Sequence, residues 1–150
     1  MKSAKSVRRR LWAVGLIVAA FGGFAVTGWT DIRTLEDAEW KAPARAARKK
    51  NPLTLDDKSI AAGQAVYAKE CLSCHGKGGK GDGEAAKDLN PKPNDLTVAK
   101  VWEQSDGALF WKLTEGRKPM PAYDKLLSDD DRWNVINYMR KSWGPKEDQK

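Results

Sequence analysis

The sequence reads Cys71-Leu72-Ser73-Cys74-His75 near its centre, with two thiols three residues apart and an imidazole directly after the second. Residues three and four apart share one face of a helix, so these three side chains converge. This spacing is the attachment signature of c-type haem, in which each cysteine forms a thioether and the histidine reaches the iron. We therefore expect one covalent haem c, attached at Cys71 and Cys74, with His75 as an axial iron ligand.

Other readings of the motif fit the sequence less well. The chain contains only these two cysteines and this one histidine, which excludes an iron–sulfur cluster, a four-cysteine zinc site and a bis-histidine haem built from this chain alone. A zinc site at the motif would lack a fourth ligand, and a disulfide across two intervening residues would constrain little. A thioredoxin-like pair would need a βαβ pattern, which the sequence lacks. A thiol–disulfide redox protein without haem is the alternative kept.

Three methionines compete for the distal side of the iron. Met1 precedes the apolar N-terminal run, and Met139 lies among apolar residues of a predicted helix, where a core role is expected. Met120 stands between Pro119 and Pro121, which restrict the loop and hold its thioether in place. We expect Met120 to be the second axial ligand. A haem enzyme or gas sensor with an open distal site is the alternative.

The motif lies at the end of a predicted helix over residues 56–73. Thr54 followed by Asp57 is typical of a helix start, and small or apolar residues then recur at spacings of three and four. Five glycines in residues 76–83 end this helix in a loop.

Two further helices are predicted in the second half of the chain. Asp106 is expected to cap one that runs through Leu113 and ends at Gly116. Ser128 is expected to cap the other, which has an acidic first turn and ends at Gly144. No segment shows the period-two alternation of a strand, so the expected fold class is all-α.

The formal charge of +7 lies outside the predicted folded region. Residues 1–52 hold 11 lysines and arginines against 4 acidic residues, whereas residues 53–150 hold 16 of each. A folded part without a basic excess offers little attraction to a phosphate backbone, so no nucleic-acid partner is expected.

The N-terminus is typical of a membrane-directing element. Five cations within residues 1–10 precede Leu11 to Trp29, a run of nineteen residues without a charged side chain. As a helix this run would be about 28 Å long, close to the hydrocarbon thickness of a bilayer. We expect a single-pass anchor, and the alternative is a signal peptide that is cleaved.

These patterns divide the chain into a basic cytoplasmic end at 1–10, the anchor at 11–29, a linker at 30–52, a folded domain at 53–145 and a tail at 146–150. The linker contains the basic run Arg45, Arg48, Lys49 and Lys50. That run is expected to be solvated, and contact with anionic lipid headgroups is the alternative.

Residues 55–143 resemble a class I monohaem cytochrome c of the membrane-anchored bacterial type. Gly63 and Tyr67 match the small and aromatic positions of that family's first helix, and Val135 and Tyr138 match its last helix. The resemblance implies a small cytochrome c fold, with three or more helices around one haem, in which these two helices cross closely at the glycine.

The resemblance extends to the surroundings of the haem. Residues 116–123 are similar to the family's methionine loop, and Leu109-Phe110-Trp111 to the helix before it. It implies that the Pro93 carbonyl orients His75 and that Leu96 packs on the haem, with Pro91 as the alternative to Pro93. The neutral domain departs from the strongly basic mitochondrial members, so lysine steering toward acidic partners is not expected.

The function expected from His/Met ligation is electron transfer, because two protein ligands leave no iron position for a substrate. We expect a carrier and not an enzyme, acting as a shuttle or as the haem subunit of a respiratory or dehydrogenase complex. Its partners would be redox proteins such as a quinol-oxidising complex, a dehydrogenase or a terminal oxidase, with no small-molecule substrate. The haem domain is expected on the periplasmic side of the membrane, or in the periplasm if the run is cleaved.

Overall fold

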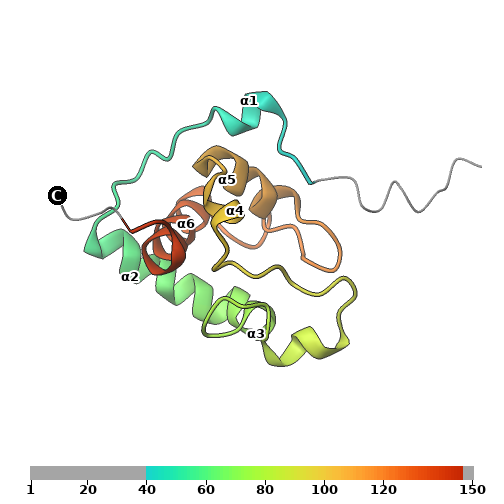
Figure 1. The fold of residues 1–150 in the computed structure, drawn as a ribbon. Helices are drawn as coiled ribbons and strands as arrows, with labels where there is room; N and C mark the ends of the chain where they lie inside the picture. The colour runs from blue at the N-terminus through green and yellow to red at the C-terminus, as the bar shows by residue number, and fades with distance from the viewer. Residues whose placement is uncertain (1–39, 147–150) are drawn as a thin grey trace, which may run out of the picture. The chain divides into compact units, whose positions relative to one another are not determined.

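The computed structural model describes residues 40–146 of the 150-residue chain (Figure 1). The predicted anchor at 11–29 and the first part of the predicted linker therefore lie outside the described residues. Within 40–146 the elements are helical, with one isolated bridge between Arg117 and Met120. The elements are α1 (Ala44–Ala47), α2 (Asp57–Val66), η2 (Tyr67–Cys71), α3 (Leu72–His75), η3 (Glu84–Asp88), α4 (Ala99–Trp102), α5 (Asp106–Glu115) and α6 (Asp129–Trp143).

The first long helix is made of α2, η2 and α3, which follow one another without a break from Asp57 to His75. Its cap is Asp56 and not Thr54, because Asp56 Oδ1 accepts a hydrogen bond of 2.8 Å from the Ser59 amide. The Thr54 hydroxyl instead donates to the other oxygen of Asp56 over 2.6 Å. The middle segment, η2, is a π-helix, a form that occurs as single turns and frequently at functional sites.

The cap of the second long helix, α5, lies one residue earlier than predicted. Ser105 is the cap, since its hydroxyl accepts from the Ala108 amide, and Asp106 is the first helical residue. The helix ends at Gly116, whose φ of 63° lies in the left-handed region that glycine adopts without strain.

The last helix, α6, begins and ends as predicted. Ser128 and Asp131 form a capping box, each side chain bonding the other residue's amide, and three aspartates occupy the first turn. The helix ends at Gly144. No helix among the described residues is long and apolar enough to cross a bilayer.

The core forms where α2 and α6 cross. Gly63 makes this approach possible, because a Cβ there would overlap the Asn134 carbonyl oxygen and lie 2.8 Å from Tyr138 Cβ. The crossing predicted from the family resemblance is therefore confirmed. Trp133, Val135 and Ile136 on α6 are the most deeply buried side chains of the core.

Part of the predicted linker packs on the domain. Residues 40–52, which we call the N-terminal strap, include α1, and the backbone of Ala46 and Lys49 lies against Gly107 of α5. The Ser105 hydroxyl donates to the Ala47 carbonyl over 2.6 Å, and Lys49 Nζ lies 4.1 Å from the centre of the Phe110 ring. The compact unit thus begins well before residue 53.

Candidate haem-binding site

The two cysteines lie on either side of the point where the π-helix η2 ends and the α-helix α3 begins. Cys71 is the last residue of the π-helix η2 and is buried, while Cys74 lies in α3 and is half-buried. Both thiols are free. Burial raises the pKa of the Cys71 thiol to about 12, so this thiol is neutral at neutral pH.

His75 is the last residue of α3, and its ring is held by a backbone carbonyl. Nδ1 lies 3.2 Å from the Asn94 oxygen. The expected partner was the carbonyl of Pro93, or that of Pro91. The carbonyl of Pro93 instead lies against Gly81, where a Cβ would overlap it, and this backbone register presents the next carbonyl to the ring.

The electrostatics of His75 suit an iron ligand. Burial lowers the pKa of His75 below its ordinary value, which favours the neutral imidazole that binds metals. A carbonyl that accepts from Nδ1 fixes the ring orientation and leaves Nε2 as the nitrogen available to iron.

The glycine-rich loop folds back onto the motif. The Gly81 and Gly83 amides donate to the carbonyls of His75 and Cys74 over 2.9 and 3.1 Å. A Cβ at Gly83 would overlap the Ser73 carbonyl oxygen, so only glycine permits this contact. The loop therefore holds the backbone of α3 in place.

Met120 lies on a short closed loop. Its amide and carbonyl pair with the carbonyl and amide of Arg117 over 2.8 and 3.0 Å, and its side chain packs partly buried against the core. Tyr123 connects this loop to the cysteine-bearing helix, since its hydroxyl donates to the Glu70 carbonyl over 3.0 Å. Met139 is 8% exposed and belongs to the core cluster on α6.

Leu96 is placed by hydrogen bonds on both sides of its backbone. Its amide donates to the Gly79 carbonyl over 2.6 Å, and its carbonyl accepts from the Trp102 indole over 2.8 Å. The side chain packs partly buried against the core. Leu96 and the Asn94 carbonyl thus belong to one segment held beside the glycine-rich loop.

The residues present fit a covalently attached haem. Two free thiols and a neutral imidazole lie within five consecutive residues, and the imidazole is already oriented. A thioether is the soft donor suited to the opposite side of the iron.

Comparisons with known proteins agree with this chemistry. Residues 58–139 match the family described as cytochrome c oxidase, cbb3-type, subunit III. The chain belongs to the c-type cytochromes. A cytochrome c6 from Microcystis aeruginosa is 36% identical over 85 residues, which cover 54% of this chain and 99% of that protein. A cytochrome c6 from Leptolyngbya boryana is 36% identical over 87 residues, covering 55% of this chain and 96% of that protein.

Among solved structures, the cytochrome resembles a chain of the Kuenenia stuttgartiensis reducing HAO-like protein complex. The TM-score is 0.55 at 35% identity, and the match covers 60% of this chain and 46% of that one. Family membership establishes the cofactor as covalent haem c and the activity as electron transfer.

Three features of the site carried no recognised signal in the sequence. They are the π-helical turn before Cys71, the Asn94 carbonyl at His75 and the Tyr123 hydroxyl bond to Glu70. Tyr123 stands within the methionine loop, so its position could have marked it. The π-helical turn and the position of the Asn94 carbonyl depend on backbone geometry, which cannot be predicted from the pattern of side chains.

Proposed function

We propose that this cytochrome is a membrane-tethered electron carrier whose haem is attached at Cys71 and Cys74 and whose iron is held between His75 and Met120. The observation that carries the proposal is the orientation of His75 by the Asn94 carbonyl beside two free thiols. The assignment of Met120 as the second ligand is supported by the hydrogen bonds that hold its loop in place, within the loop and to Glu70.

The chain's residues have separate tasks in this proposal. The haem, when bound, supplies a one-electron iron couple. Asn94 fixes the imidazole, the Arg117–Met120 pairing holds the thioether, and the core around Leu96 excludes water. Two protein ligands leave no position for a substrate, which supports electron transfer without catalysis.

The ligand set can be tested with two methionine variants. Met120→Ala should lower the reduction potential by a sizeable part of the roughly 0.8 V that axial ligands span, and should open the iron to carbon monoxide. Met139→Leu, a volume-conserving change in the core, should leave both properties nearly unchanged. Spectroelectrochemistry and carbon monoxide difference spectra measure the two effects. The reverse outcome would make Met139 the ligand.

The tether is proposed on the sequence pattern of residues 11–29. Full-length protein should stay with membranes through high-salt and carbonate washes, because burial of apolar residues is insensitive to ionic strength. Haem-stained gels of the washed membranes provide the measurement. A mature protein that begins near residue 28 and is found in the soluble exported fraction would show that the run is a cleaved signal peptide.

Redox proteins are the proposed partners, and the haem domain is proposed to lie on the periplasmic side. The solved relative belongs to a reducing HAO-like protein complex, which supports a role as a subunit of a redox complex. We propose a respiratory or dehydrogenase complex as that assembly.

A further inference from the structure

The N-terminal strap carries a local excess of positive charge. Residues 40–51 contain five lysines and arginines and no acidic residue. Lys49 is engaged, since its Nζ lies 3.6 Å from an Asp129 oxygen. Arg45 and Arg48 are exposed, and no carboxylate among residues 40–146 forms an ion pair with either. We call Arg45, Arg48 and the exposed Lys50 the strap surface.

Two hollows flank this surface. One, of about 540 Å³, is lined by Pro43, Arg45, Ala46, Arg48 and Lys49, so its charged side chains are all cationic. The other, of about 330 Å³, lies between the strap and the start of α5.

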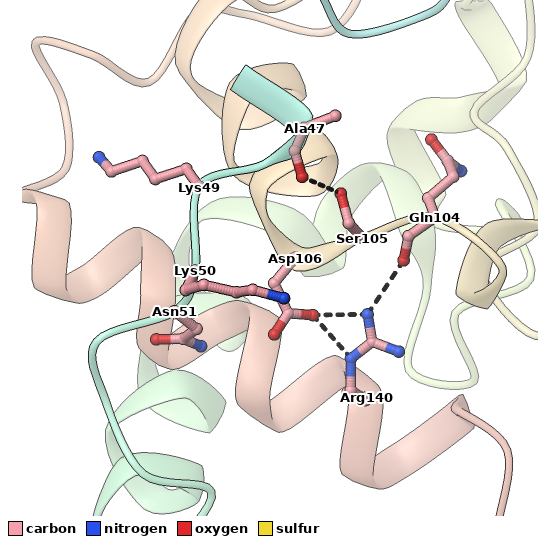
Figure 2. Close-up of a pocket in the computed structure, with 8 residues that line it drawn as sticks. All are labelled: Ala47, Lys49, Lys50, Asn51, Gln104, Ser105, Asp106 and Arg140. Atoms are coloured by element: carbon pink, nitrogen blue, oxygen red, sulfur yellow. Dashed lines mark hydrogen bonds and ion pairs between the residues drawn. The ribbon is translucent and has the colours of Figure 1, made fainter. Parts of the chain in front are cut away.

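Cations also dominate the second hollow. Figure 2 shows Lys50 extending across it toward Asp106. The Asp106 carboxylate already accepts from Arg140, whose Nε lies 2.9 Å from Oδ1. Asp106, the one acidic residue that lines the second hollow, is therefore neutralised by Arg140. Both hollows thus offer positive charge to an approaching anion.

The strap is held to the rest of the domain by hydrogen bonds. Binding of the strap to a surface would therefore orient the whole domain. The Ser105 hydroxyl donates to the Ala47 carbonyl, and Nδ2 of the Asn51 side chain donates to Asn137 Oδ1 of α6 over 2.8 Å. In Figure 1 the segment α1 and the haem-attachment helix α3 lie at opposite ends of the domain. A surface that holds the strap would leave the α3 end facing away from it.

We propose that the strap surface docks on anionic lipid headgroups and so holds the haem-bearing end of the domain away from the bilayer. The inference rests on the proposed tether. Only about ten residues separate Trp29 from Trp40, and such a stretch spans at most roughly 36 Å. The strap therefore stays near the membrane, where basic side chains are attracted to anionic lipid.

A lipid surface fits these observations better than an acidic protein. The cations lie on the segment nearest the proposed span and far from α3, whereas a redox partner must approach the haem. Electrostatic docking of this kind is screened by salt, because the Debye length falls from about 8 Å at physiological ionic strength to about 3 Å at 1 M.

The test is polarised absorbance of the haem in full-length protein held in supported bilayers. Phosphatidylcholine bilayers are compared with bilayers that also contain phosphatidylglycerol. The total absorbance left after a carbonate wash reports the tether, and the dichroic ratio reports the orientation. Arg45→Glu/Arg48→Glu is compared with Lys87→Glu/Lys100→Glu, which reverses the same charge at exposed lysines elsewhere on the domain. An unchanged haem spectrum verifies that each variant is folded.

We expect a polarised signal only with phosphatidylglycerol, lost at high salt and in the arginine variant but retained in the lysine variant. Each basic side chain that is removed from the strap surface should weaken the docking equilibrium by about fivefold. Retained absorbance with an isotropic signal in both bilayers would overturn docking while leaving the tether intact. An orientation that appears only in native membranes would overturn it too, in favour of a protein partner. Absorbance lost from both bilayers would refute the tether, and docking with it.

Discussion

Tyr123 shows how one hydroxyl links ligand position to stability. It is 5% exposed, and its donation to the Glu70 carbonyl joins the methionine loop to the cysteine-bearing helix. Desolvation by burial raises the pKa of Tyr123 well above its ordinary value, and the same cause raises that of Tyr67. Both side chains are therefore neutral in the folded protein over the physiological range.

The sign of this pKa shift predicts an alkaline effect. A raised folded-state pKa contributes stability that is complete below the unfolded value of about 10 and is lost as pH rises above it. Tyr123→Phe should cost about 1 kcal/mol at neutral pH, the worth of a hydrogen bond. The deficit should shrink by about 1.4 kcal/mol per pH unit above pH 10, because phenylalanine does not ionise.

Urea unfolding followed by circular dichroism, from neutral to alkaline pH, measures this convergence. Stability curves of the wild type and the variant that stay parallel up to the highest pH would contradict the assignment of Tyr123 as a buried donor.

At the scale of elements, the crossing of α2 and α6 depends on Gly63. Gly63→Ala should destabilise the holoprotein by about 3 kcal/mol or prevent folding, because the added methyl would meet the Asn134 backbone. Gly78→Ala is the control, since its Cβ would meet nothing closer than Lys80 Cγ at 3.8 Å. Urea midpoints compare the two. Equal midpoints would show that the helices can separate without cost.

The elements also show what the sequence could predict. The bounds of α6 follow from local signals, a serine cap with an acidic first turn and a final glycine, so they were predicted correctly. The cap of α5 was misplaced by one residue because Ser105 and Asp106 are both good capping residues. At His75 the choice of the Asn94 carbonyl over that of Pro93 is set by backbone register, which side-chain patterns do not encode.

At the scale of the whole molecule, the sequence predicts a linker at residues 30–52, whereas the strap at residues 40–52 packs on the domain. Its helix α1 has four residues and buries none of them, so no apolar periodicity marks it. Its attachment comes from tertiary contacts that the sequence does not display, such as Lys49 over the Phe110 ring and Asn51 against Asn137. By contrast, the signals of the central helix are local, so its predicted range of 56–73 lies close to the observed range of 57–75.

The strap therefore predicts where the domain can be cut. In a chain that begins at Trp40, the domain should be as stable as in the full-length protein. In a chain that begins at Leu53, its free energy of unfolding should fall by roughly 3 kcal/mol. The loss combines the Ser105–Ala47 and Asn51–Asn137 hydrogen bonds, about 1 kcal/mol each, with a cation–π contact worth up to about 1 kcal/mol. Both chains keep the residues proposed to bind haem, so their reduced haem spectra should agree. Urea unfolding of the two haem-loaded chains measures the difference, and coincident curves would mean that the strap rests on the domain without stabilising it.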